Sequence, residues 1–181
     1  VRADPLRLRM LRVVADDLGT DKTNSLSRHS LYDNIIRILL DRIIAGERSA
    51  DQLRGAIRKF GLESLKKGLS RLAFAAHEAF LVEMNAAHVT RAFDDSPRIA
   101  AAVWLLARAG QLPPLEPRGE GNIGFFHLTI AEHLAAGEVR PDMFDERRKL
   151  EDAWWQTVML SALDRFSDDA QLAIALDAAA K

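Results

Sequence analysis

Histidines are the side chains of this sequence best suited to acid–base or metal chemistry. The 181 residues include five of them: His29, His77, His88, His127 and His133. No HExxH pattern occurs, and the six-residue separation of His127 and His133 does not place two ligands on one face of a helix. A metal site would need ligands from distant segments, so we expect none. Packing or surface roles are the simpler interpretation of His77 and His88.

Nucleophilic and phosphate-binding motifs are missing from the sequence. The chain has no cysteine, which excludes disulfides, thiolate catalysis and cysteine-ligated zinc. Serine, histidine and aspartate all occur, but without the nucleophile-elbow pattern that positions a catalytic serine. Gly119 and Gly121 are not followed by the Lys-Ser/Thr pair of a phosphate-binding loop. We therefore expect that this chain by itself is not an enzyme and carries no Walker-type ATPase site.

A helix-turn-helix signal lies in residues 52–71. The residues that form this signal are Gln52, Ala56, Gly61 and Leu65. Ala56 and Gly61 are five positions apart, whereas the usual motif has four. Basic side chains accompany them: Arg54, Arg58, Lys59, Lys66, Lys67 and Arg71. Asp51 and Glu63 interrupt this patch, and 25 basic against 26 acidic residues give a net charge of -1, without the basic field of a polyanion binder. A winged-helix DNA-binding transcriptional regulator stays the alternative interpretation, and we expect no nucleic-acid partner.

Apolar residues at helical spacing occupy most of the chain, so the elements that position these groups are mainly helices. The pattern predicts helices over residues 5–18, 30–45, 50–60, 62–83 and 96–109, a short helix after the β-prone segment, and two helices between residues 142 and 181. Ser30 with Asp33, and Thr129 with Glu132, have the spacing of capping boxes at two of the helix starts.

Residues 111–126 differ in composition from the helical segments. Proline and glycine punctuate residues 113–121, and residues 123–126 are β-prone. This pattern predicts two short strands around a turn at residues 118–122, the one strand signal in the sequence. We therefore expect a mainly α fold, with a winged-helix-like domain that contains a small β-hairpin.

Residues 123–136 resemble the segment near the end of the winged-helix region in NACHT-type STAND ATPases, the NLR-like signalling proteins. Eight positions match that segment: Phe125, Phe126, His127, Thr129, Glu132, Leu134, Ala135 and Ala136. Ile130 and Ala131 replace the usual Phe-Gln, and His133 replaces an aromatic residue.

Three other stretches resemble the same family in the right order. Residues 4–11 look like its Asn-Pro-Leu helix, with Asp4 in place of Asn, and residues 30–42 look like its Leu-Tyr-Glu helix. Residues 152–158 are similar to the Trp-containing helix that opens its superhelical region. The resemblance implies three parts: the last helix of a helical domain with a linker (1–27), a winged-helix-like domain (28–137) and the start of an α-superhelical array (138–181). The family's nucleotide-binding core, with its Walker motifs, has no counterpart in this sequence.

The resemblance implies a regulatory, nucleotide-sensing function. In the family, the histidine matched by His127 contacts the β-phosphate of ADP in the closed state, and the proline matched by Pro5 packs against adenine. The parent protein would bind ADP or ATP with Mg²⁺, whereas we expect no cofactor on the isolated chain. The expected partners are the nucleotide-binding core and sensor repeats of the same parent, which would form a homo-oligomer on ADP-to-ATP exchange and serve bacterial defence signalling.

Hydropathy and composition indicate where the protein works. The mean hydropathy is -0.10 and no long uncharged apolar run occurs, so we expect no transmembrane span and no membrane partner. The lack of cysteine and of a signal peptide predicts a cytoplasmic protein. A purely structural helical scaffold for protein contacts is a third function class that the sequence leaves open.

Overall fold

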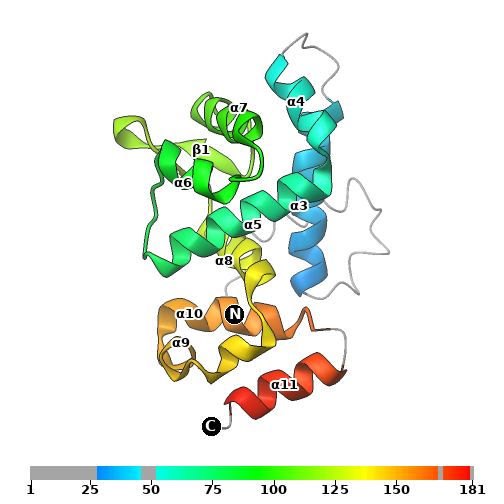
Figure 1. Cartoon of the computed structure of the whole chain (residues 1–181), viewed down its shortest axis with the longest axis vertical. Coiled ribbons are helices and arrows are strands. Elements are labelled where there is room, and N and C mark those ends of the chain that lie inside the picture. The colour runs from blue at the N-terminus through cyan, green and yellow to red at the C-terminus, as the bar shows by residue number, and fades with distance from the viewer. Residues whose placement is uncertain (1–27, 46–51, 167–168, 180–181) are drawn as a thin grey trace, which may run out of the picture.

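Figure 1 shows a computed structural model of the chain, which describes residues 28–45, 52–166 and 169–179. The predicted helix over residues 5–18, with Pro5, lies outside these residues. The described part is mainly helical and contains one two-stranded antiparallel sheet. The prediction of a mainly α fold with a small β-hairpin is confirmed.

The first three described helices are α3 (Arg28–Ala45), α4 (Gln52–Phe60) and α5 (Leu62–Glu78). In α3 the apolar side chains of Leu31, Ile35, Ile36 and Leu40 are buried, and Ile36 and Leu40 have no exposed surface. Gly61 alone separates α4 from α5, and its φ of 91° lies in the region that favours glycine. A helix-turn-helix joins its helices through a turn of about three to four residues, so the motif predicted in residues 52–65 is wrong.

The elements from α5 onward follow the order of a winged helix. After α5 come α6 (Ala86–Ala92), α7 (Pro97–Arg108), β1 (Leu115–Pro117) and β2 (Ile123–Phe125). Leu115 lies opposite Phe125 in the antiparallel register, and Met84 bridges Ile123 on the other edge of β2. The backbone N–H of Met84 donates to the Ile123 carbonyl at 2.8 Å, and Ile123 donates back at 2.9 Å. The order of one helix, the Met84 bridge, two helices and two strands resembles that of a winged helix, in which α6 and α7 would occupy the helix-turn-helix positions.

α5 ends at Glu78, before its predicted end at Glu83. The N–H groups of Phe80 and Leu81 donate to the carbonyls of His77 and Ala76. This closing turn requires a residue in the left-handed region, and Phe80 occupies it with a φ of 54°.

The sequence pattern missed α6 because the helix has only seven residues. Its start is nevertheless well defined. The Asn85 side chain accepts hydrogen bonds from the N–H groups of Ala87 and His88, while the His88 ring accepts from the Asn85 N–H. This reciprocal pair is a capping box, and it explains His88 as a surface residue with a local structural role.

α8 (Leu128–Ala135) follows β2 and packs against α5. Both predicted capping boxes are wrong, because Ser30 lies inside α3 and Thr129 lies inside α8. The N-cap of α8 is His127, whose side chain accepts from the Thr129 N–H. The carbonyl of Ser30 accepts from the side-chain amide of Asn34 one turn later.

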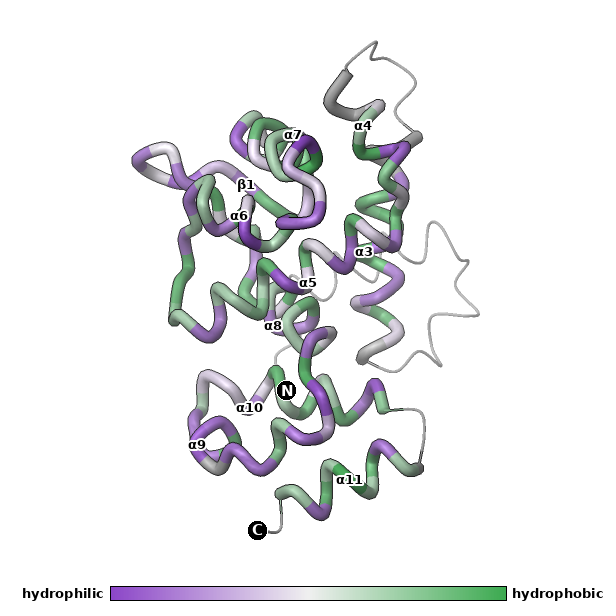
Figure 2. The backbone as a smooth tube through the Cα atoms, viewed as in Figure 1, coloured by the Kyte–Doolittle hydropathy of each residue, from purple (hydrophilic) through white to green (hydrophobic). Residues whose placement is uncertain are grey.

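The C-terminal part has more elements than the two predicted helices: η2 (Ala136–Glu138), η3 (Pro141–Asp145), α9 (Arg147–Glu151), α10 (Ala153–Leu163) and α11 (Asp169–Ala179). α10 packs against α8 and buries Val158, Met159 and Ala162. α11 packs against η3. In Figure 2, α9 is largely hydrophilic, whereas α11 carries several hydrophobic residues.

Gly68 allows α5 to approach the end of α6 closely. A Cβ atom at Gly68 would lie 2.1 Å from the ring of Phe93, which is 1% exposed and directly follows α6. Any larger side chain would displace this ring, so the packing of the winged helix depends on a glycine at this position.

Candidate functional site

His127 presents one ring nitrogen at the start of α8. Its Nδ1 atom accepts a hydrogen bond from the Thr129 N–H at 3.2 Å. Because Nδ1 acts as the acceptor, the proton of the neutral ring is on Nε2. No residue in the described ranges forms a hydrogen bond with Nε2. His127 therefore offers an N–H donor at a helix N-terminus, where the helix dipole also favours negative charge.

A cavity of about 260 Å³ lies beside His127, and we call it the His127 cavity. Apolar side chains form most of its wall, including Leu81, Val82, Phe126 and Leu128. Its polar side chains are His77, Arg118 and His127. An apolar hollow with a few convergent polar groups is the usual form of a binding site, which makes this cavity the main candidate.

Arg118 combines a structural role with its place on the cavity wall. Its guanidinium donates to the Phe125 carbonyl at 3.0 Å and forms an ion pair with Glu116 at 2.7 Å. These contacts fix the guanidinium across the β-hairpin, within the same cavity as His127. The cavity therefore contains a positively charged donor besides the His127 ring N–H, and Glu116 partly neutralises its charge.

His77 forms the inner wall of the cavity together with Trp154. The two rings are stacked with their centroids 4.5 Å apart, and the His77 side chain is 3% exposed. Burial lowers the pKa of His77 below its ordinary value of 6.5, against the opposing effects of the Trp154 carbonyl and Asp152. The prediction of a packing role for His77 is confirmed.

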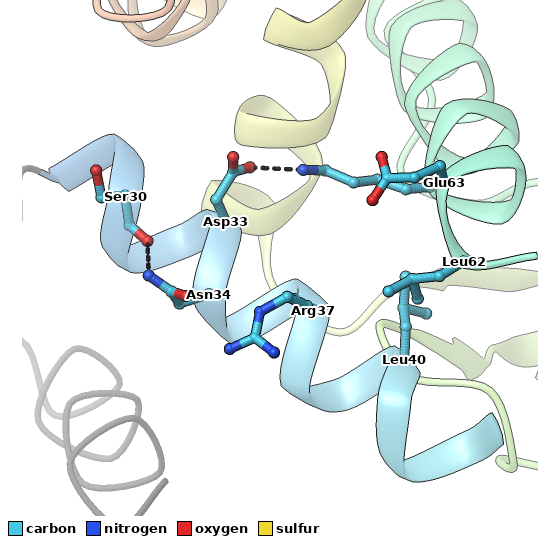
Figure 3. A pocket seen from close by; sticks show the side chains of 8 residues that line it. Ser30, Asp33, Asn34, Arg37, Leu40, Leu62 and Glu63 are labelled. Atoms are coloured by element: carbon cyan, nitrogen blue, oxygen red, sulfur yellow. Dashed lines mark hydrogen bonds and ion pairs between the residues drawn. The ribbon is translucent and has the colours of Figure 1, made fainter. Parts of the chain in front are cut away.

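A second, more polar pocket of about 280 Å³ lies between α3 and α5. Figure 3 shows Asp33 and Arg37 of α3 on one side and Leu62 and Glu63 of α5 on the other. The two cations that line it already have acidic partners in the structure. Arg37 lies 3.3 Å from Asp41, and Lys66 lies 3.0 Å from Asp33.

Asp33 accepts two hydrogen bonds at the edge of this pocket. Its Oδ1 atom lies 3.0 Å from Lys66 Nζ and 3.0 Å from Nε2 of the buried His133. Burial alone would raise the pKa of Asp33, but the hydrogen bonds from His133 and Lys66 outweigh it and hold the pKa well below its usual range. This arrangement joins α3, α5 and α8, and we interpret it as a structural tether.

α7, the helix that would read DNA in a winged helix, exposes apolar as well as basic side chains. The exposed residues of α7 include Arg98, Ala101, Leu105 and Arg108. Leu105 is 51% exposed, and the Arg108 guanidinium donates to the Gly121 carbonyl of the hairpin turn. α4 also packs against α7 (Figure 1). Base recognition relies on exposed polar side chains, of which α7 offers Arg98 and Arg108, and Arg108 is already bonded to the hairpin turn.

Within the described residues, no cluster of three or more His, Asp or Glu side chains could hold a metal ion. No helix in the same part of the chain is long and apolar enough to cross a membrane. Of the two predicted nucleotide contacts, His127 lies at the cavity, whereas Pro5 lies outside the described residues.

Comparison of the chain with family models, with curated proteins and with solved structures gives no match. The site is therefore interpreted from its own geometry. Sequence patterns singled out His127 but missed Arg118, and they gave no sign that His77 and Trp154 lie at the same cavity. The chain folds these residues together from segments that share no local motif.

Proposed function

We propose that this chain is the regulatory segment of a STAND signalling ATPase of the NACHT type, in which His127 senses the phosphate of bound ADP. The observation that carries the proposal is the fixed orientation of the His127 ring. Its Nδ1 atom caps α8, so the Nε2–H group is available to an anion at the helix N-terminus. The resemblance of residues 123–136 to the family supplies the identity of that anion.

In this proposal the nucleotide-binding core of the parent protein holds ADP with Mg²⁺, and its β-phosphate meets His127 in the closed state. Arg118, on the wall of the same cavity, adds positive charge nearby. ADP-to-ATP exchange removes the contact, and the freed segment permits homo-oligomerisation of a cytoplasmic signalling protein. The winged-helix part (28–137) would act as the sensor, and the helices that follow (138–181) would begin the superhelical region.

His127→Asn in the full-length parent tests the proposal, because asparagine is a good N-cap but its shorter side chain places no N–H donor at the position of Nε2. A charge-assisted hydrogen bond contributes about 1.5–3 kcal/mol, so its loss should speed ADP release roughly 10- to 150-fold. Stopped-flow release of a fluorescent ADP analogue measures this rate. The parent should also become active without its trigger.

Thermal unfolding of the 181-residue chain provides the control. His127→Asn should preserve the melting temperature, because the cap of α8 is retained, whereas His127→Ala should lower the stability by about 1 kcal/mol. Unchanged ADP release in a correctly folded His127→Asn parent would contradict the proposal. A variant that loses stability as much as His127→Ala would show that the asparagine does not replace the cap.

A further inference from the structure

Three stacked aromatic rings join the end of α5 to the first turn of α10. Trp154 lies between His77, with ring centroids 4.5 Å apart, and Phe80, with centroids 6.0 Å apart. The edge of Trp155 also meets His77, at 4.7 Å between centroids. Trp154 lines the His127 cavity, so this joint is also a wall of the candidate site.

Two hydrogen bonds join His77 to Trp154, and the second of them defines the tautomer of the His77 ring. The Trp154 indole N–H donates to the His77 carbonyl at 2.9 Å, and His77 Nε2 lies 2.8 Å from the Trp154 carbonyl. A carbonyl only accepts, so Nε2 carries the proton and Nδ1 of the neutral ring is bare. A second proton would bind Nδ1, with which no residue of the described ranges forms a hydrogen bond.

Several charged or titratable groups belong to the joint or line the cavity beside it. Asp152, the N-cap of α10, attracts a proton to the ring, and the adjacent Glu78 is paired with Lys149 at 3.3 Å. Lys149 lies over the Trp155 ring, at 4.7 Å from its centroid. Across the cavity stand Arg118 and His127. Burial of the ring outweighs the attraction of Asp152, and the pKa of His77 is lowered as a result.

We propose that protonation of His77 releases Trp154 and the first turn of α10, and so opens the His127 cavity from its inner side. The buried imidazolium would lack an acceptor for its second N–H, and separation of the rings lets water reach it. The rest of α10 stays docked through the buried Val158 and Met159. The joint is thus a proton-sensitive hinge, and it operates whether or not the ligand of His127 is a nucleotide.

The lowered pKa of His77 sets the direction in which pH acts on the joint. The pKa of His77 in the closed joint lies below 6.5, so the neutral ring and the closed joint are favoured together above pH 6.5. As the pH falls below 6.5 toward the lowered pKa, the closed joint loses stability. The joint should therefore be closed at pH 7.5 and open increasingly below pH 6.5.

NMR spectroscopy of the unaltered 181-residue chain tests the proposal between pH 7.5 and 5.0. The His77 imidazole and the Trp154 indole N–H should titrate with a common midpoint below pH 6.5, and the indole hydrogen should lose protection from exchange across the same range. The indole of Trp104, on α7, should keep its shift. A Trp154 indole that stays protected after His77 has titrated overturns the proposal.

Two variants identify the titrating group. His77→Gln retains a side-chain donor for the Trp154 carbonyl but does not titrate, so the pH-dependent opening should disappear. His88→Gln, at the third position of α6 and outside the cavity, keeps a capping-box side chain and should leave the opening unchanged. Opening that persists in His77→Gln, or is lost in His88→Gln, assigns the transition to another group and refutes the hinge. Should His77→Gln fail to fold, the coincidence of the two titrations in the unaltered chain decides the question.

Discussion

Asp33 connects three helices through one carboxylate. It belongs to α3, and its partners Lys66 and His133 belong to α5 and α8. The Tyr32 ring also lies 5.5 Å from the ring of His133, between centroids. Because α8 begins at His127, the tether links the position of α3 to the helix that carries the candidate phosphate donor.

Asp33→Asn should destabilise the chain by about 1–2 kcal/mol at pH 7. Hydrogen bonds to a charged group contribute somewhat more than this, and the 35% exposure of the Asp33 side chain reduces the effect through solvent screening. The lowered pKa means that the carboxylate stabilises the fold above pH 3.8 and loses this contribution as the pH falls below 3.8. Urea unfolding at pH 7, 5 and 3 should therefore show the wild type and the variant converging at acidic pH.

Asp41→Asn is the matched control on the same helix. Asp41 forms an exposed ion pair with Arg37, and such pairs contribute little, so the change should be below about 0.5 kcal/mol. Equal effects of Asp33→Asn and Asp41→Asn would show that the Asp33 carboxylate does not hold α3 in place.

At the scale of the elements, the close approach of α5 to Phe93 should make Gly68 intolerant of any side chain. Gly68→Ala should destabilise the chain by about 1–3 kcal/mol, although alanine favours helices, because its Cβ atom would overlap a buried ring. Gly55→Ala in α4 meets no atom within 4 Å and should stabilise the chain by about 0.5–1 kcal/mol. Thermal unfolding of the pair measures both effects, and a neutral Gly68→Ala would mean that α5 and Phe93 can separate without cost.

Long helices with an apolar stripe could be predicted from the sequence, whereas short ones could not. α3 and α7 have regular apolar spacing, and the proline at the start of α7 marks its first turn. α6 is too short for periodicity, although Asn85 at its start is a capping signal. The early end of α5 depends on the left-handed Phe80, a position where glycine would have been the recognisable signal.

At the scale of the whole molecule, charge bears on the DNA-binding alternative. α7 exposes the apolar Ala101 and Leu105 beside the basic Arg98 and Arg108, and the chain has a net charge of -1, without a basic field. We therefore expect no shift of duplex DNA in native gels at about 10 µM protein and low salt, where electrostatic binding is strongest. A shift that Arg98→Gln abolishes would restore the DNA-binding alternative.

The position of the winged helix in the chain could not be predicted from local motifs. The pairing of Met84 with Ile123 completes this part of the fold, and no spacing rule connects these two residues, which are distant in sequence. The helix-turn-helix prediction failed for this reason, since residues 52–65 matched a local pattern without the partners that complete the fold. The candidate site, too, could be predicted from the sequence only in part. The segment around His127 was recognisable, but His77 and Trp154 reach the cavity only through the packing of α10 near the end of α5.

The bridge from Met84 to Ile123 has a practical consequence for protein engineering. It holds β2 from the side opposite β1, while β1 packs against α7, so each strand is anchored by a different part of the chain. Gly119 and Glu120, at the tip between the strands, are exposed. The tip can therefore accept an inserted epitope, fluorophore or protease site, and a chain cut there would remain assembled as two non-covalently associated fragments.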